Sequence, residues 1–159
     1  MFLIVLTVHV LTLCALVGTA VMLDLRLLGL TLRRVPASEV LAGLLPWTVA
    51  GFLMMVASGA LLFYAEPVVK YQNLFFRLKM VTLLLAIMNA WVFYRTVYRK
   101  VADWELDPVP PRGAQVAGGL SLAFWAVIIT LGRLIPYQAY WFNCARQPQS
   151  AIINWLMGC

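Results

Sequence analysis

A single histidine and a few polar side chains interrupt otherwise apolar stretches of this sequence, and these residues are the best placed to do chemistry. His9 is the only histidine and lies in the first apolar stretch. Lys79 and Arg133 lie at the edges of two later stretches, and Asn89 lies inside one of them. Charged and polar side chains are costly within a bilayer, so each marks a candidate functional position. These four are therefore candidate cofactor-binding residues.

The types of these residues limit the cofactors that they could bind. Imidazole ligates copper and haem iron, so His9 is also a candidate metal ligand. A bis-histidine haem needs two histidines, so haem b here would need a second ligand of another type or from another chain. Methionine is a soft copper ligand, but no Met-x-x-Met or Cys-x-x-Cys pair occurs. Cations near the membrane surface suit an anionic or carbonyl oxygen. Haem b, copper, a bound lipid and a quinone are the candidates.

The elements that must position these residues are membrane-spanning helices. Hydrophobic residues make up 64% of the chain and charged residues 11%, against about 45–50% and about 25% in soluble domains. Residues 2–23, 40–65 and 113–132 contain no Asp, Glu, Lys or Arg. Each stretch approaches or exceeds the roughly 20 residues that cross about 30 Å of hydrocarbon.

A fourth stretch is too short to span by itself. Residues 80–94 are free of charge, and as a helix they reach only about 22 Å. To cross the bilayer, this helix must take Lys79 below the interface or let its ammonium reach outward.

The sequence thus predicts an all-α integral membrane protein, a four-transmembrane-helix bundle with a short C-terminal interfacial segment. We expect one transmembrane domain over residues 1–137, with helices at about 2–30, 39–64, 73–100 and 114–137. Residues 138–159 are expected to form a periplasmic or interfacial segment. Ser38 and Asn73 are placed to cap the second and third helices.

The distribution of basic residues predicts the orientation. The connections after the first and third helices hold seven of the twelve Lys and Arg residues. We therefore expect a multi-pass protein of the bacterial inner membrane with both termini periplasmic. His9, Lys79 and Arg133 then lie at similar depth in the outer leaflet. The net charge of +6 fits membrane orientation, and no basic stripe with interleaved aromatics suggests nucleic acid.

Three further residues are expected to have structural roles. Asp24 and Arg26 are two residues apart, so they point to different sides of a helix and should bond elsewhere. Asn73 is the third.

Cys144 and Cys159 both fall on the expected periplasmic side, where either a disulfide or two free thiols fits the oxidising compartment.

Three stretches also resemble a known group of sequences. DLRLLGL (24–30), YQNLFFRLKMVTLLLAIMNA (71–90) and SLAFWAVIITLGRLIPY (121–137), with His9, resemble a bacterial inner-membrane family known only as a domain of unknown function. The resemblance extends to about Tyr137. It implies motif positions at His9, Asp24, Arg26, Asn73, Lys79, Asn89 and Arg133. Residues 79–89 are more loosely similar to the membrane domain of copper-resistance protein D, which implies copper handling.

Two functional hypotheses follow. The first is a non-enzymatic accessory or structural subunit of a membrane complex, with an outer-leaflet polar site for lipid or cofactor. Its expected partners are the lipid bilayer and either other membrane subunits or further copies of the chain. The second is a copper-handling or haem- or quinone-linked redox protein that uses His9. No catalytic triad, phosphate-binding loop or carboxylate pair occurs, so the sequence favours a protein that is not an enzyme.

Overall fold

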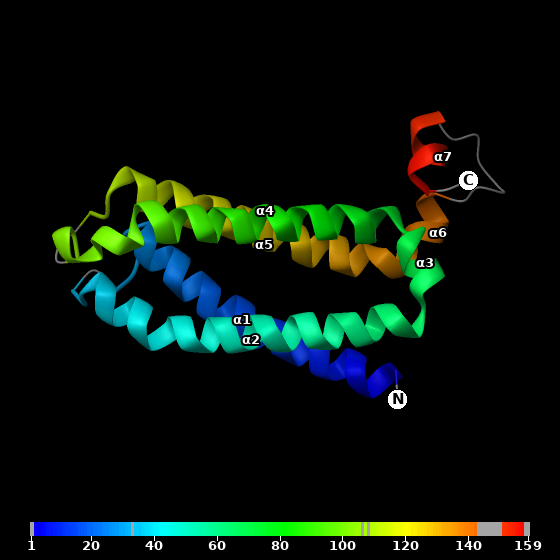
Figure 1. Ribbon diagram of the computed structural model, residues 1–159, viewed down its shortest axis with the longest axis horizontal. Coiled ribbons are helices and arrows are strands. Elements are labelled where there is room, and N and C mark those ends of the chain that lie inside the picture. Colours follow the sequence, from blue (N-terminus) through cyan, green and yellow to red (C-terminus); the bar gives the residue numbers. More distant parts are fainter. Residues whose placement is uncertain (1, 33, 106, 108, 143–150, 158–159) are drawn as a thin grey trace.

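The structure is a computed structural model that describes residues 2–32, 34–105, 107, 109–142 and 151–157, and helix is the only regular structure among them. Four helices are long: α1 (Phe2–Leu27), α2 (Ala37–Ala65), α4 (Leu74–Thr96) and α5 (Arg112–Leu134) (Figure 1). The short elements are α3 (Pro67–Tyr71), the 3₁₀ helices η1 (Tyr98–Asp103) and η2 (Ile135–Tyr137), α6 (Gln138–Trp141) and α7 (Ala151–Met157).

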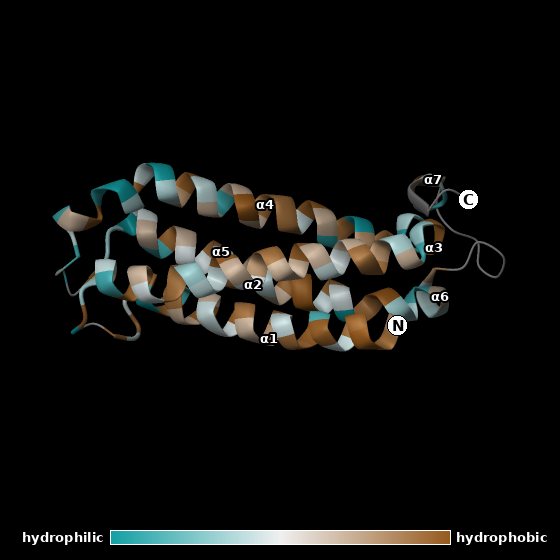
Figure 2. Cartoon of the chain, turned by 60° about the horizontal axis from the view of Figure 1, so that its bottom comes forward, coloured by the Kyte–Doolittle hydropathy of each residue, from teal (hydrophilic) through white to brown (hydrophobic). Residues whose placement is uncertain are grey.

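The four long helices have the length and hydropathy of membrane spans. α1, α2 and α4 contain 26, 29 and 23 residues. The fourth span contains 30 residues, because helical structure continues from α5 through η2 and α6 to Trp141. Apolar residues fill the length of the bundle, and hydrophilic residues gather toward its two ends (Figure 2). The predicted four-helix membrane bundle is confirmed: by helix length and hydropathy, the chain is a multi-pass membrane protein.

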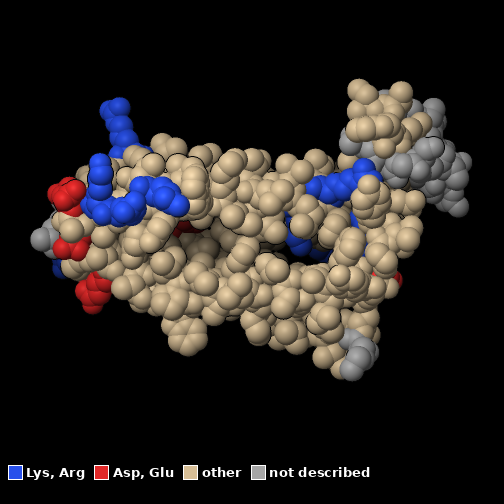
Figure 3. All heavy atoms as spheres, in the orientation of Figure 1, with Lys and Arg blue, Asp and Glu red and all other residues tan. Residues whose placement is uncertain are grey.

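The bundle consists of two helix pairs. α1 packs along α2, α4 packs along α5, and α1 also contacts α5. α2 and α4 are joined through α3 but touch at few points, which leaves a hollow between the pairs (Figure 3). We call the end of the bundle that carries α3 and α6 the α3 end, and the opposite end the η1 end. The N-terminus lies at the α3 end (Figure 1).

Glycine ends α1 earlier than expected, at Leu27 rather than near residue 30. Gly29 adopts φ 70°, a left-handed conformation that side chains disfavour. Its N–H donates to the Arg26 carbonyl at 3.0 Å, and the Leu30 N–H donates to the Leu25 carbonyl at 3.0 Å. This pair of bonds is a Schellman motif, which satisfies the last carbonyls of the helix.

The start of α2 differs from the prediction that Ser38 caps it. The helix begins at Ala37, and Pro36 holds the cap position without a side-chain hydrogen bond. The Ala37 N–H instead donates to the Glu105 carbonyl at 3.1 Å, and the Ser38 hydroxyl donates to the Glu105 carboxylate. The cap is supplied by a distant loop, a contact that local sequence does not encode.

The start of α4 matches the prediction that Asn73 caps it. The Asn73 Oδ1 accepts from the Phe76 N–H at 3.0 Å, and its Nδ2 donates to the Ile135 carbonyl at 3.0 Å. The Gln138 Oε1 accepts from the Leu74 N–H at 2.6 Å. These bonds tie the start of α4 to the chain after α5. At its other end α4 stops at Thr96, before the expected residue 100, and the chain continues as η1.

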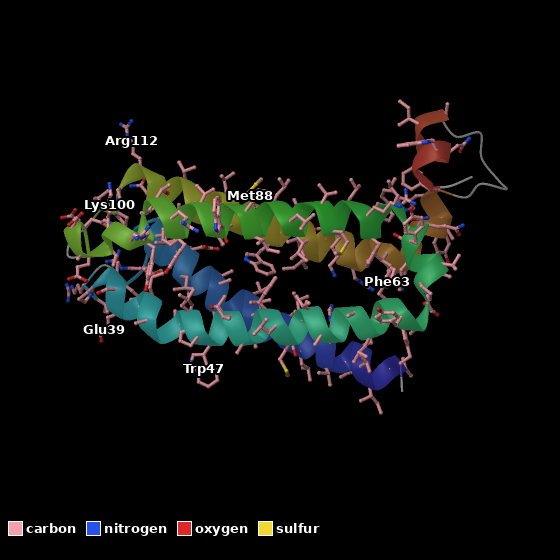
Figure 4. All side chains as sticks on the ribbon, viewed as in Figure 1. Glu39, Trp47, Phe63, Met88, Lys100 and Arg112 are labelled. Carbon is pink, nitrogen blue, oxygen red and sulfur yellow. The ribbon has the colours of Figure 1, made fainter. Side chains whose placement is uncertain are left out.

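The main cluster of buried apolar residues lies at the η1 end. It comprises Leu23, Leu27, Ala37, Val40, Leu41, Trp104 and Ala114. Many large apolar side chains elsewhere face outward: Trp47, for example, is 72% exposed and points away from the bundle (Figure 4). Such a surface suits contact with lipid, and the bundle is held tightly at one end.

Candidate functional site

The central hollow is the space between the two helix pairs near His9 and Ser58 on one side and Lys79 and Gly132 on the other. At the η1 end the two helix pairs approach closely. A Cβ added at Gly118 of α5 would lie only 2.9 Å from the Asp24 carbonyl oxygen of α1. α1 then runs away from α5 toward the α3 end (Figure 1). Lys and Arg atoms are visible inside the hollow toward the α3 end (Figure 3).

His9 is held in a defined orientation by α2. Its Nδ1 lies 2.7 Å from the Ser58 Oγ. The Ser58 hydroxyl donates its single proton to the Met54 carbonyl, also at 2.7 Å, a common bond for serine within a helix. When the Ser58 proton lies on the Met54 carbonyl, the His9 Nδ1 carries a proton and donates to Ser58. This assignment leaves the His9 Nε2 with an unshared electron pair.

A small residue lets the His9 ring lie against α2. A Cβ at Gly59 would be 3.4 Å from the ring Cε1, so the imidazole lies in contact with α2 at this glycine. Ser58 is itself buried, with 7% of its surface exposed. Together these two residues hold the His9 ring in position against α2.

Lys79 reaches into the hollow from α4. It lies about 8 Å along the helix from Leu74 and is half-buried. Its Nζ would be 3.7 Å from a Cβ at Gly132, so the ammonium lies against the backbone of α5. It is also within electrostatic range of His9. Among the residues that the structure describes, Lys79 has no hydrogen-bond or ion-pair partner.

Aromatic side chains close the hollow toward the α3 end. Phe63 of α2 (labelled in Figure 4) and Phe76 of α4 stack with centroids 5.7 Å apart. This contact joins the two helices that otherwise lie apart. A ligand in the hollow would therefore enter sideways, between α2 and α4.

The other two predicted cofactor-binding residues lie elsewhere. Arg133 is exposed, and its guanidinium lies 5.2 Å from the centroid of the Tyr137 ring. Asn89 donates from Nδ2 to the Ala117 carbonyl at 2.9 Å, which ties α4 to α5. The structure thus brings His9 and Lys79 near one another and places neither Arg133 nor Asn89 against them.

Asp24 and Arg26 bond to other segments, as expected from their spacing. The Asp24 carboxyl bonds to Ser121 of α5. Arg26 is 1% exposed, and its guanidinium donates to the Val35 carbonyl at 3.0 and 3.3 Å and to the Glu105 carbonyl at 3.4 Å. The Asp24 Oδ2 and the Arg26 Nη1 are buried without a partner.

Sequence reasoning missed some residues that complete these arrangements. Ser58 and Gly132 lie on stripes of small residues, which usually serve helix packing, so their roles beside His9 and Lys79 were not evident. Glu105 lies in a loop, where no periodic pattern points to a partner. The predicted pair Cys144 and Cys159 lies outside the described residues.

The described part of the chain contains no group of three or more His, Cys, Asp or Glu that could hold a metal ion. A metal at His9 would therefore not be held by such a group among these residues.

Comparison with known proteins places the chain in a family. Residues 3–138 match a family of unknown function, DUF6644. The chain belongs to this family. The match covers all four spanning helices and ends at the first residue of α6, close to the limit expected from sequence. No curated protein and no solved structure matches the chain, so the likeness to copper-resistance protein D stays a prediction.

We expect Arg26→Ala to destabilise this DUF6644 protein strongly. The change removes a charged donor from two carbonyl acceptors, and we expect the free energy of unfolding to fall by roughly 2–3 kcal/mol. Arg34→Ala is the matched control, because Arg34 is exposed in the same connection and should change stability by less than about 0.5 kcal/mol. Unfolding in mixed micelles, followed by circular dichroism, measures both. Equal losses would show that Arg26 has no special role.

Proposed function

We propose that the protein is a non-enzymatic accessory or structural subunit of a bacterial inner-membrane complex, and that its central hollow binds the oxygen-bearing head of a lipid or quinone. The observation that supports this most is the Lys79 ammonium, which lies in the hollow with no partner among the described residues. An unpaired cation inside a membrane protein is costly. A bound anionic or carbonyl oxygen would remove that cost.

The chemistry of His9 complements that of Lys79. Lys79 offers up to three N–H donors, whereas the His9 Nε2 in the assigned tautomer accepts a hydrogen bond. A matching head group carries a carbonyl or anionic oxygen for Lys79 and a hydroxyl for His9. Quinols and hydroxyl-bearing lipid head groups have this combination. The open side between α2 and α4 supports entry of such a molecule from the bilayer.

The role as a subunit rests on surfaces that the bundle itself leaves uncovered. Large aromatic side chains such as Trp47, Trp91 and Tyr64 are more than half exposed, and aromatics are enriched at protein interfaces. The chain also extends beyond the family match at residue 138, through the rest of α6 and α7. Such an extension would suit binding to other membrane subunits or to a second copy.

A second candidate function is copper handling or haem- or quinone-linked redox chemistry at His9. The Nδ1–H of a metal-bound histidine is usually held by a hydrogen bond while Nε2 binds the metal. His9 has this arrangement, with Ser58 as the acceptor. The described residues supply one histidine and no group of three or more His, Cys, Asp or Glu, so the site would be completed by a ligand of another type or from a second chain.

The membrane orientation is part of the proposal. We place the α3 end and both termini on the periplasmic side, because the connections at the η1 end carry most of the basic residues. The hollow at His9 and Lys79 then lies in the outer leaflet.

Lys79→Met tests the ligand site. The protein extracted from its native membrane in mild detergent should carry a quinone or lipid adduct by native mass spectrometry. We expect Lys79→Met to weaken retention of this adduct about 10- to 100-fold, as for loss of a charged hydrogen bond. Lys70→Met is the control, because Lys70 pairs with Glu66 at 3.6 Å outside the hollow. A wild-type protein without adduct, or equal loss in both variants, would contradict the ligand site.

A protein that always appears without other subunits would contradict the subunit role.

His9→Ala tests the redox alternative. If His9 binds haem or copper, protein taken from the native membrane should show a Soret band or stoichiometric copper, and His9→Ala should abolish it. Ser58→Ala should reduce occupancy less, because it frees the Nδ1–H without removing the ligand. A colourless, metal-free wild-type preparation would rule out this function and leave the lipid or quinone site standing.

Reporter fusions test the orientation. Alkaline phosphatase fused after residue 159 should be active, because this enzyme needs an oxidising compartment to form its disulfides. A fusion at residue 107, in the connection after α4, should be inactive. The reverse pattern would move the hollow to the inner leaflet.

A further inference from the structure

A groove lies between two helices of the bundle, toward the end remote from the central hollow. α4 and α5 form a groove of about 380 Å³ near the η1 end. Its apolar lining includes Val92 and Phe93 of α4 and Val116 and Leu120 of α5. Val92, Val116 and Leu120 are exposed there, at 45%, 61% and 45%. The bond from Asn89 to the Ala117 carbonyl holds the two helices together across it.

The groove has a cation at its rim. Arg112 is the first residue of α5, lines the groove and is exposed. It points away from the bundle at the η1 end (Figure 4). In the part of the chain that is described, Arg112 has no hydrogen-bond, ion-pair or ring partner. A lone guanidinium beside an apolar groove complements an anionic head group attached to a hydrocarbon chain.

The surrounding charges strengthen this complementarity. Lys and Arg atoms lie along the side of the bundle at the η1 end, whereas Asp and Glu atoms lie farther out, at its tip (Figure 3). Arg95 stacks over Trp91, 5.3 Å from the ring centroid, a pairing typical of the membrane interface. The cations therefore lie between the hydrocarbon region and the acids, at the depth of lipid phosphates.

The length of the groove suits a lipid acyl chain. From Arg112 to Leu120 it runs about 12 Å along α5, which is most of the roughly 15 Å depth of one hydrocarbon leaflet. One extended acyl chain would fit.

We propose that this groove binds one anionic phospholipid, with an acyl chain between α4 and α5 and its phosphate at Arg112. The site lies at the opposite end of the bundle from Lys79 and is independent of the function proposed for the hollow. It gives the protein a preference for anionic lipid in the leaflet at the η1 end.

Native mass spectrometry of the full chain tests this site. Phosphatidylglycerol and phosphatidylcholine with identical acyl chains are titrated separately into the detergent-solubilised protein. We expect tighter binding of phosphatidylglycerol, and Arg112→Gln should weaken it about fivefold, the typical contribution of one basic residue near a membrane surface. Binding of phosphatidylcholine should not change. Lys70→Gln at the α3 end is the charge control and should leave both affinities unchanged.

A second pair of variants tests the groove itself. Leu120→Trp should fill it and weaken binding of both lipids, whereas Ile129→Trp, exposed on the same helix outside the groove, should not. Equal binding of the two lipids by wild-type protein would overturn the proposal. So would an Arg112→Gln effect no larger than that of Lys70→Gln, or equal effects of the two tryptophan variants. A change in oligomer mass without a change in lipid binding would identify the groove as a protein contact and also overturn it.

Discussion

The buried guanidinium of Arg26 holds the η1 end of the bundle together. It joins the end of α1 to the Val35 carbonyl before α2 and to the Glu105 carbonyl after η1. Glu105 in turn binds the Ala37 N–H and the Ser38 hydroxyl at the start of α2. Burying a charge is costly unless carbonyls or acids replace its water, so these three segments must stay together. The apolar cluster around Trp104 packs beside them.

This fixed end explains why the bundle opens at the other. Close approach of α1 to α5 is possible where Gly118 lies against the Asp24 carbonyl, and the helices diverge beyond that point. α2 and α4 meet again at the Phe63–Phe76 stack near the α3 end. The polar groups of the hollow therefore lie between a packed base and an aromatic contact.

Hydropathy predicted the four spans and the depth of each polar residue, but it does not determine the rotation of a helix about its axis. Arg133 and Lys79 were expected at similar depth, yet the residue of α5 that faces Lys79 is Gly132, about 100° around the helix from Arg133. Local patterns sufficed where the contact is local, as for the Asn73 cap. They failed for Ser38, because its partner Glu105 lies 67 residues away. Packing between distant segments decides such contacts.

The placement of the acids leaves Lys79 without an ion-pair partner among the described residues. The chain has six Asp and Glu residues. Glu39 lies in the first turn of α2, at the η1 end, and Asp24 lies in α1. It is about 22 Å along α1 from His9 and bonds to Ser121. Glu66, the acid at the α3 end, pairs with Lys70. Electrostatic attraction falls with distance and with competing partners, so neither acid can neutralise the ammonium in the hollow. Under the proposed function, the oxygen-bearing head of a bound lipid or quinone balances this charge.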